Sequence, residues 1–187
     1  MDNKYTEIEM KFPLSNPKEL IQRLNKIAKL KLEDVFQKDT YFIPAHRNFL
    51  DKKKISEWLR IRETDGKITL NYKNWYSDGF HCDEFETIIE DVTALKKIFE
   101  SLDFKEIMIV EKTRNAWIYK EVEIVIDEVK DLGFFIELEA KTNLELEKAK
   151  KLLYETLKEL KAETGEQDFK GYPWRLLEKK GLLRVIE

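Results

Sequence analysis

Residues 7–12 read Glu-Ile-Glu-Met-Lys-Phe, so charged and apolar side chains alternate along this stretch. A period of two is typical of a β-strand, in which successive side chains point to opposite faces of the sheet. Glu7, Glu9 and Lys11 therefore share one face, and three large apolar residues share the other. The pattern predicts a strand over 5–12 with one face suited to a core and one charged face.

Seven further segments have strand character. Charged residues alternate with apolar ones in most of them, and the Asp65-Gly66 pair between two of them is typical of a tight hairpin. Asn115 and Gly133 predict two further breaks in the chain. The expected strands after the first are 33–43, 57–64, 67–75, 83–90, 105–114, 116–128 and 134–141.

Amphipathic helices account for the segments between and after the strands. Apolar residues recur at helical spacing through 17–30, where a proline stands in the first turn. Thr93 is the expected N-cap of a second helix, and a third runs from Asn143 to about Lys161. A short fourth helix is expected to begin at Pro173.

The charged strand faces predict how these elements assemble. Eight strands with a few helices indicate an α+β domain built on an antiparallel sheet that is closed or strongly curled. We expect the charged faces to line an inner lumen, and the apolar faces to form a core outside it, against the helices. The length of 187 residues suits a single domain over 1–187.

Like charges recur at alternate positions of single strands. Such side chains lie roughly 7 Å apart and repel each other unless a bound partner or an opposite charge compensates them. A lumen lined by acids and bases suits a polyanion bound to the cations, with metal ions bound to the carboxylates. Antiparallel strands also commonly present charges to solvent, so the residues alone leave a polyanion site and a solvated surface as two open interpretations.

The composition argues against several classes of protein. The net charge is −3, from 34 basic and 37 acidic residues, so no overall positive field favours nucleic acid as a partner. The single cysteine, Cys82, cannot form an intramolecular disulfide, and no P-loop motif is present. Neither a secretion signal nor a long apolar segment is evident, so we expect a cytoplasmic protein that does not bind membranes.

Several short charged motifs are spread over residues 5–141. In chain order they are Glu7-x-Glu9-x-Lys11, Arg60-Ile61-Arg62, Lys73, Glu84-Phe85-Glu86, Lys112-Thr113-Arg114, Asp127 and Glu137-Leu138-Glu139. Their order and spacing resemble those of the CYTH superfamily, which includes class IV adenylate cyclases, thiamine triphosphatases and inorganic triphosphatases. The resemblance implies an eight-stranded antiparallel tunnel that binds a triphosphate together with Mg²⁺ or Mn²⁺.

The resemblance also implies roles for individual residues. The expected phosphate-binding residues are Lys11, Arg60, Arg62, Lys73, Lys112 and Arg114. The expected ligands of Mg²⁺ or Mn²⁺ are Glu7, Glu9, Glu137 and Glu139. Lys73 and Asp127 are the expected catalytic residues, Asp127 as a group that positions water, with Glu123 nearby. Cys82 departs from the pattern, because relatives often have a basic residue at this position.

The expected function is therefore that of a metal-dependent enzyme acting on ATP, thiamine triphosphate or tripolyphosphate. Chemistry like that of class IV adenylate cyclases, from ATP to cyclic AMP and pyrophosphate, is favoured over that of a dedicated triphosphatase. The alternatives are a noncatalytic domain that binds triphosphate or polyphosphate, and an interaction domain whose charged face meets a protein. A noncatalytic binder has less use for metal-binding carboxylates, which favours the enzyme. We expect a monomer or a homodimer.

Overall fold

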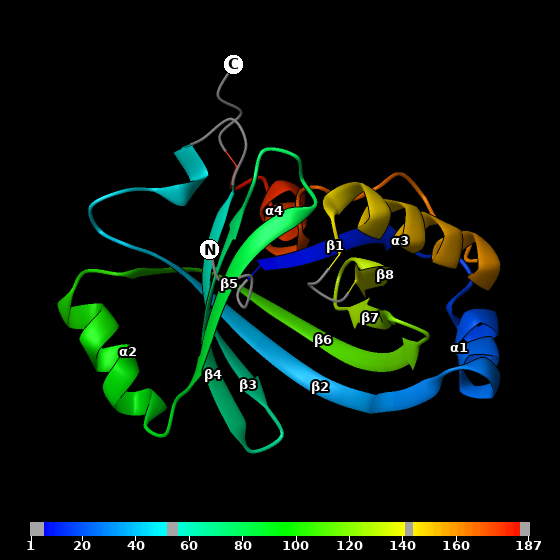
Figure 1. Ribbon diagram of the computed structural model, residues 1–187. Coiled ribbons are helices and arrows are strands. Elements are labelled where there is room, and N and C mark those ends of the chain that lie inside the picture. The colour runs from blue at the N-terminus through cyan, green and yellow to red at the C-terminus, as the bar shows by residue number, and fades with distance from the viewer. Residues whose placement is uncertain (1–5, 52–55, 141–143, 184–187) are drawn as a thin grey trace.

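The computed structural model describes residues 6–51, 56–140 and 144–183. Within these ranges the chain forms eight strands, four α-helices and one 3₁₀ turn (Figure 1). The elements are β1 (Thr6–Pro13), α1 (Pro17–Ile27), β2 (Lys29–Ile43), η2 (Phe49–Asp51), β3 (Glu57–Thr64), β4 (Lys67–Trp75), β5 (His81–Ile88), α2 (Val92–Ser101), β6 (Lys105–Tyr119), β7 (Val122–Val129), β8 (Gly133–Ala140), α3 (Leu146–Leu160) and α4 (Tyr172–Lys179).

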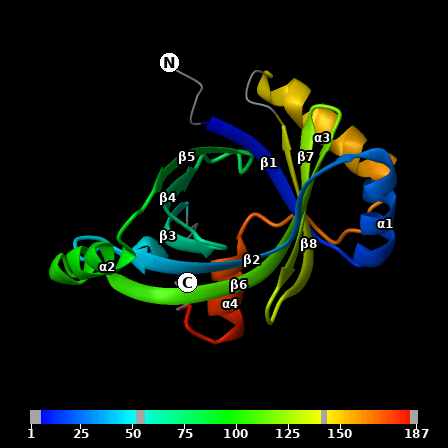
Figure 2. The ribbon, with the colours of Figure 1, turned by 90° about the horizontal axis from the view of Figure 1, so that it is seen from below.

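The strands form a closed antiparallel barrel in the order β1-β5-β4-β3-β2-β6-β7-β8. β1 closes the barrel because it pairs with β5 through residues 6–8 and with β8 through residues 8–13. Figure 2 shows the strands curving around the interior. The expected α+β fold with a closed antiparallel sheet is confirmed.

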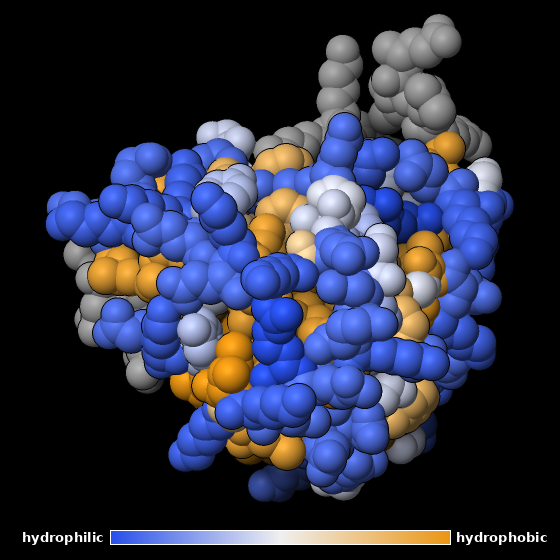
Figure 3. Space-filling model, turned by 90° about the vertical axis from the view of Figure 1, so that its right-hand side faces the viewer, coloured by the Kyte–Doolittle hydropathy of each residue, from blue (hydrophilic) through white to orange (hydrophobic). Residues whose placement is uncertain are grey.

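Most of the apolar core lies outside the barrel, between the strands and three of the helices. α1 and α3 cover β1, β7 and β8, where Leu24 and Leu153 are fully buried in one cluster with Ile124. α2 lies on the other side of the molecule, where Phe99 packs in a cluster with Ile61 (Figure 1). The outer surface on the side of α1 and α3 is mainly hydrophilic, with apolar residues between the polar ones (Figure 3). This arrangement leaves the inner strand faces to the charged residues.

α4 differs from the other helices because it packs against inward-facing side chains at one end of the barrel. Tyr41 lies two residues from Asp39 on β2, and Val110 lies two residues from Lys112 on β6. Each apolar residue therefore points to the same inner face as its charged neighbour. Leu177 of α4 is buried in a cluster with both of them. The expected core outside the barrel is therefore only partly correct, because an apolar end of the lumen must also be covered, and α4 covers it.

Two predicted boundaries around β2 are wrong. α1 ends at Ile27 instead of residue 30, and β2 begins at Lys29 instead of residue 33. Lys29 and Leu30 pair with the far end of β6, so tertiary pairing overrides the helical pattern of the sequence. In the part of the chain that is described, no helix is both long and apolar enough to span a membrane.

The predicted strand break at Asn115 is also wrong. β6 continues through Asn115 to Tyr119, and the turn follows at Lys120, whose φ is 56°. The Asn115 side chain instead accepts a hydrogen bond from the backbone N–H of Asp34 and donates one to the Asp34 carboxylate. Asp34 lies at an irregularity in β2 and has φ 47°. A turn-forming residue thus stabilises a bulge in the neighbouring strand.

Three helix starts also differ from prediction. The N-cap of α2 is Asp91, whose carboxylate accepts a 2.9 Å hydrogen bond from the backbone N–H of Ala94, and not Thr93. α3 begins at Leu146, whereas the predicted start at Asn143 lies outside the described residues. α4 begins at Tyr172, one residue before the predicted Pro173.

Candidate active site

The barrel encloses a cavity of about 500 Å³ that is lined mainly by charged side chains. Ten of the eleven predicted site residues line it together: Glu7, Glu9, Lys11, Arg60, Arg62, Lys73, Lys112, Arg114, Glu137 and Glu139. They come from β1, β3, β4, β6 and β8, so five strands contribute to one site. The eleventh residue, Asp127, is completely buried behind this lining.

Asp127 holds two of the predicted phosphate-binding cations in place. It lies directly opposite Arg114 on the neighbouring strand and accepts two parallel hydrogen bonds from it, of 2.8 and 2.7 Å. Lys112 Nζ and the Tyr172 hydroxyl also donate to Asp127, over 3.0 and 2.9 Å. Burial alone would raise the Asp127 pKa, but Arg114 and Lys112 outweigh it and hold the pKa far below its usual range. These contacts favour a positioning role for Asp127 over direct contact with a substrate.

Asp39 makes the equivalent arrangement across β2 and β3, and β2 pairs directly with the β6 strand that carries Lys112 and Arg114; the sequence reasoning missed Asp39. Arg62, directly opposite on β3, donates two hydrogen bonds of 2.7 Å to the Asp39 carboxylate, and Arg60 donates a third of 3.3 Å. Burial would raise the Asp39 pKa, but the two guanidinium groups outweigh it and keep the pKa well below its usual range. The sequence signal that could have identified Asp39 is its position between Gln37 and Tyr41, at alternate residues of one strand face.

Lys11 and Lys73 also face carboxylates on other strands. Lys11 Nζ lies 3.1 Å from Glu137, its register partner on β8. Lys73 Nζ lies 2.7 Å from Glu9 and 3.1 Å from Glu84, a second lumen carboxylate absent from the predicted set. Burial would lower the Lys73 pKa, but Glu9 and Glu84 outweigh it and raise the pKa well above its usual value. Lys73 therefore stays a cation at neutral pH.

Carboxylates crowd together where β1, β8 and β7 lie side by side. Glu139 is the register partner of both Glu9 and Glu123, so three acidic residues form a row across the sheet. Burial, together with the charges of Glu9 and Glu137, raises the pKa of Glu139 to about 7. Like charges directly opposite each other destabilise a sheet, so this row favours a bound cation.

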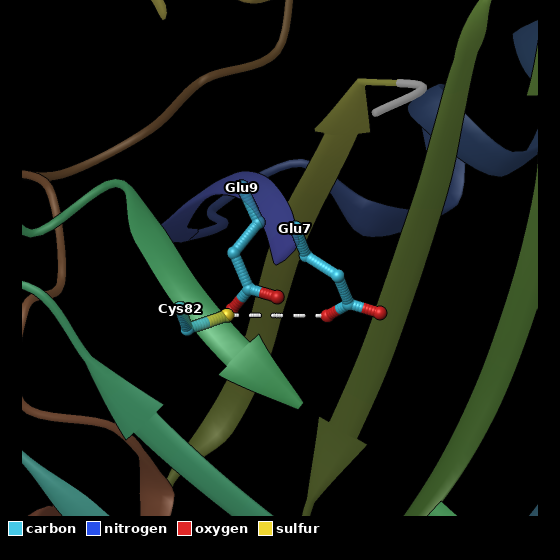
Figure 4. A group of neighbouring side chains, drawn as sticks. All are labelled: Glu7, Glu9 and Cys82. Atoms are coloured by element: carbon cyan, nitrogen blue, oxygen red, sulfur yellow. Dashed lines mark hydrogen bonds between the residues drawn. The ribbon is translucent and has the colours of Figure 1, made fainter. Parts of the chain in front are cut away.

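Glu7 extends the acidic group toward β5 (Figure 4). Its carboxylate lies near that of Glu9 and 4.0 Å from the sulfur of Cys82. Burial and a hydrogen bond with Glu84 raise the pKa of Glu7 to about 9, so these two carboxylates share a proton at neutral pH. Clustered carboxylate oxygens are the donors that Mg²⁺ and Mn²⁺ prefer, and the donor set at Glu7 and Glu9 fits either ion.

Lys112 has the most unusual environment among the lumen cations. Its side chain is only 1% exposed and lies near Arg114 and Arg62. Burial, followed by the repulsion from Arg114, lowers the pKa of Lys112 to about 7 despite the ion pair with Asp127. An added anion in the lumen would favour the charged form of this residue.

The model of one protein family and several known proteins are similar to this chain. The CYTH domain model matches residues 5–172. A Methanocaldococcus jannaschii protein named "Putative adenylate cyclase" is 33% identical over 158 residues, which cover 83% of this chain and 88% of that protein. The structure of the PH1819 protein from Pyrococcus horikoshii OT3 is 28% identical, with a TM-score of 0.78 over 92% of this chain and 99% of that chain.

A plant protein shares the fold at lower identity. The Hippeastrum protein, described as an adenylyl cyclase candidate with a dominant triphosphatase activity, is 21% identical, with a TM-score of 0.62 over 97% of this chain and 99% of that chain. The family match covers nearly all of the described chain and includes every charged motif of the lumen. This chain therefore belongs to the CYTH domain family.

Proposed function

We propose that this chain is a metal-dependent enzyme that acts on a triphosphate, with the cyclisation of ATP to cyclic AMP and pyrophosphate as the first candidate reaction. The single observation that carries the proposal is the cavity in which the six predicted basic side chains and a group of crowded carboxylates lie together. The name of the Methanocaldococcus jannaschii relative supports a cyclase. We also propose that residues 1–187 act as one tunnel domain.

The basic side chains would bind the phosphate oxygens. Arg62 and Arg114 each use Nε and one terminal nitrogen to bind an aspartate, which leaves the other terminal nitrogen for a phosphate. Because these aspartates are buried, the two guanidinium groups are fixed before the substrate arrives. Fixed cations around the place where charge develops are what phosphoryl and nucleotidyl transfer require.

Lys73 would stabilise charge at the reacting phosphate. Its ammonium lies among the carboxylates of Glu7, Glu9 and Glu84, and it stays protonated at neutral pH. We therefore assign it charge stabilisation and not proton abstraction. We assign Asp127 to the positioning of Lys112 and Arg114.

The acidic side chains would bind the divalent ion. The proposed ligands of Mg²⁺ or Mn²⁺ are Glu7, Glu9, Glu137 and Glu139. When bound, such an ion neutralises phosphate charge and polarises a phosphorus–oxygen bond. A noncatalytic polyphosphate binder is less favoured, because crowded carboxylates repel a polyanion and would weaken its binding.

Product analysis tests the proposal. The purified chain is incubated with ATP, thiamine triphosphate or tripolyphosphate, with Mg²⁺, Mn²⁺ or excess EDTA, and the products are separated by anion-exchange chromatography. Cyclic AMP with pyrophosphate, formed only when metal is present, is the expected result. Orthophosphate would identify a triphosphatase instead. Binding of these compounds without any product would contradict the enzyme and identify a noncatalytic domain.

A further inference from the structure

Tyr172, the first residue of α4, reaches the phosphate-binding residues although it lies far from them in the sequence. It is 4% exposed, and its hydroxyl donates a 2.9 Å hydrogen bond to Oδ2 of Asp127. The same oxygen accepts hydrogen bonds from Lys112 Nζ at 3.0 Å and from Arg114 Nη2 at 2.7 Å. One carboxylate oxygen thus joins the tyrosine to two lumen cations.

The aromatic ring of Tyr172 contacts two lumen cations directly. Lys11 Nζ and Lys112 Nζ lie 4.4 and 5.1 Å from the ring centroid, within the range of a cation–π interaction. Phe135 packs edge-on against the same ring, with the ring centroids 5.0 Å apart. The ring is therefore fixed, and it limits where the two ammonium groups can lie.

The chain before α4 brings Tyr172 to this place. The backbone N–H groups of Gly165 and Asp168 donate to the carbonyls of Pro13 and Lys11, over 3.1 and 2.7 Å, so the segment follows β1. Gly171 then adopts φ 79°, a conformation that favours glycine, immediately before the helix. The C-terminal segment 163–179 is thus bound to β1 at one end and buried in the barrel at the other.

We propose that Tyr172 is a positioning residue for the triphosphate site, so that docking of the C-terminal segment 163–179 completes the phosphate-binding surface. The inference rests on the proposed function and assigns a residue to it. The hydroxyl shares the negative charge of Asp127 without adding a charge of its own. Lys112 and Arg114 are then less fully neutralised by Asp127 and more available to phosphate.

The test compares Tyr172→Phe with the wild-type chain. The substitution keeps the ring and removes one hydrogen bond, so tripolyphosphate should bind about three- to tenfold more weakly, the change expected for one buried hydrogen bond. Affinity is measured by isothermal titration calorimetry, with Mg²⁺ and separately with EDTA. For a substrate that the enzyme converts, KM should rise while kcat changes less than about twofold. This pattern is expected when a lost interaction stabilised the bound substrate and the transition state equally.

Tyr119→Phe is the matched control. Tyr119 also donates a hydrogen bond to a carboxylate, that of Glu159 at 3.2 Å, but on the exposed exterior of the barrel. Its removal should leave tripolyphosphate affinity unchanged. Thermal melts of both variants show whether either change acts through folding, and affinities are measured well below the melting temperature.

The outcomes separate this inference from the proposed function. Wild-type chain that binds tripolyphosphate in neither condition would contradict the proposed function itself. If the wild-type chain binds tripolyphosphate and Tyr172→Phe binds it with equal affinity, only the role of Tyr172 is overturned. Tyr172→Leu, which also removes the ring, should bind more weakly than Tyr172→Phe; equal affinity in all three chains would overturn the contribution of the ring as well.

Discussion

Asp39 and Arg62 lie directly opposite each other on β2 and β3 and are joined by two hydrogen bonds of 2.7 Å. Arg114 and Asp127 repeat this relationship across β6 and β7. In both pairs the aspartate is fully buried and the arginine reaches the cavity. The barrel wall therefore supplies the anions that hold these cavity-lining cations in position, including those proposed to bind phosphate.

Removal of a buried aspartate should destabilise the fold. Asp39→Ala leaves Arg60 and Arg62 without their buried partner, so we expect a loss of about 3–5 kcal/mol in the free energy of unfolding. Glu159→Gln is the control, because it breaks the exposed Lys120–Glu159 pair and should cost far less stability than the loss of a buried partner. Urea unfolding followed by circular dichroism measures both. Equal costs for the two variants would contradict the structural role of Asp39.

Removal of a proposed metal-binding charge should strongly reduce turnover without unfolding the protein. Glu9→Gln and Glu137→Gln are nearly isosteric changes, and we expect rates on the order of 10²–10³-fold lower, as for loss of one electrostatic contact to a transition state. The measurements are initial rate against metal concentration, and thermal melts. If both variants keep the wild-type rate and metal dependence, these residues are not metal ligands.

The stability of the metal-free protein should fall as the pH rises from about 4.5 to 7. Glu139 has its pKa raised from 4.5 to about 7, so its protonated form is favoured by folding, and the stabilising proton is lost as the pH passes through this range. The loss is at most about 3 kcal/mol. Melting temperatures in EDTA from pH 4.5 to 8 test this, and Mg²⁺ should restore stability at pH 8.

A neutral residue at position 139 should remove this part of the pH dependence. The melting temperature of Glu139→Gln should depend less on pH between 4.5 and 7 than that of the wild type. Mg²⁺ should also stabilise this variant less. Glu155→Gln, on the exposed surface of α3, should keep the wild-type profile. Identical profiles for wild type and Glu139→Gln would show that Glu139 is ionised normally.

Triphosphate binding should weaken above pH 7 because Lys112 loses its charge there. Its pKa in the free protein is lowered to about 7, whereas a bound polyanion favours the ammonium form. Binding above pH 7 should therefore take up a proton, and the affinity should fall by at most about tenfold per pH unit. Calorimetry in two buffers of different ionisation enthalpy measures the uptake. Lys112→Arg, which stays charged, should take up less than the wild type.

Replacement of a bidentate arginine should weaken binding even where the charge is kept. Arg62→Lys cannot form both parallel hydrogen bonds to Asp39 and present a fixed nitrogen to phosphate, so we expect tripolyphosphate affinity to fall about three- to thirtyfold. Arg23→Lys, on α1 outside the barrel, should leave the affinity unchanged. Unchanged affinity in Arg62→Lys would show that Arg62 has only a structural role in the barrel and does not bind phosphate.

The alternation in the sequence was sufficient to predict which side chains share a strand face. The period of two in β1, β3, β4 and β8 is a local property, because neighbouring side chains of any strand must point to opposite faces. The resemblance to the CYTH superfamily supported the expectation that these faces line a tunnel, and Glu9, Arg62 and Glu137 do line one cavity. The limits of β3 and β4 also followed from local pattern and a two-residue turn.

Properties that depend on pairing between distant segments were decided only by the tertiary structure. The continuation of β6 through Asn115 depends on an irregularity in β2, and the partnership of Asp39 with Arg62 depends on strand register. The position of Tyr172 depends on how the C-terminal segment follows β1. Sequence period fixes the face on which a residue lies, whereas hydrogen-bond register and packing between remote elements fix its neighbours.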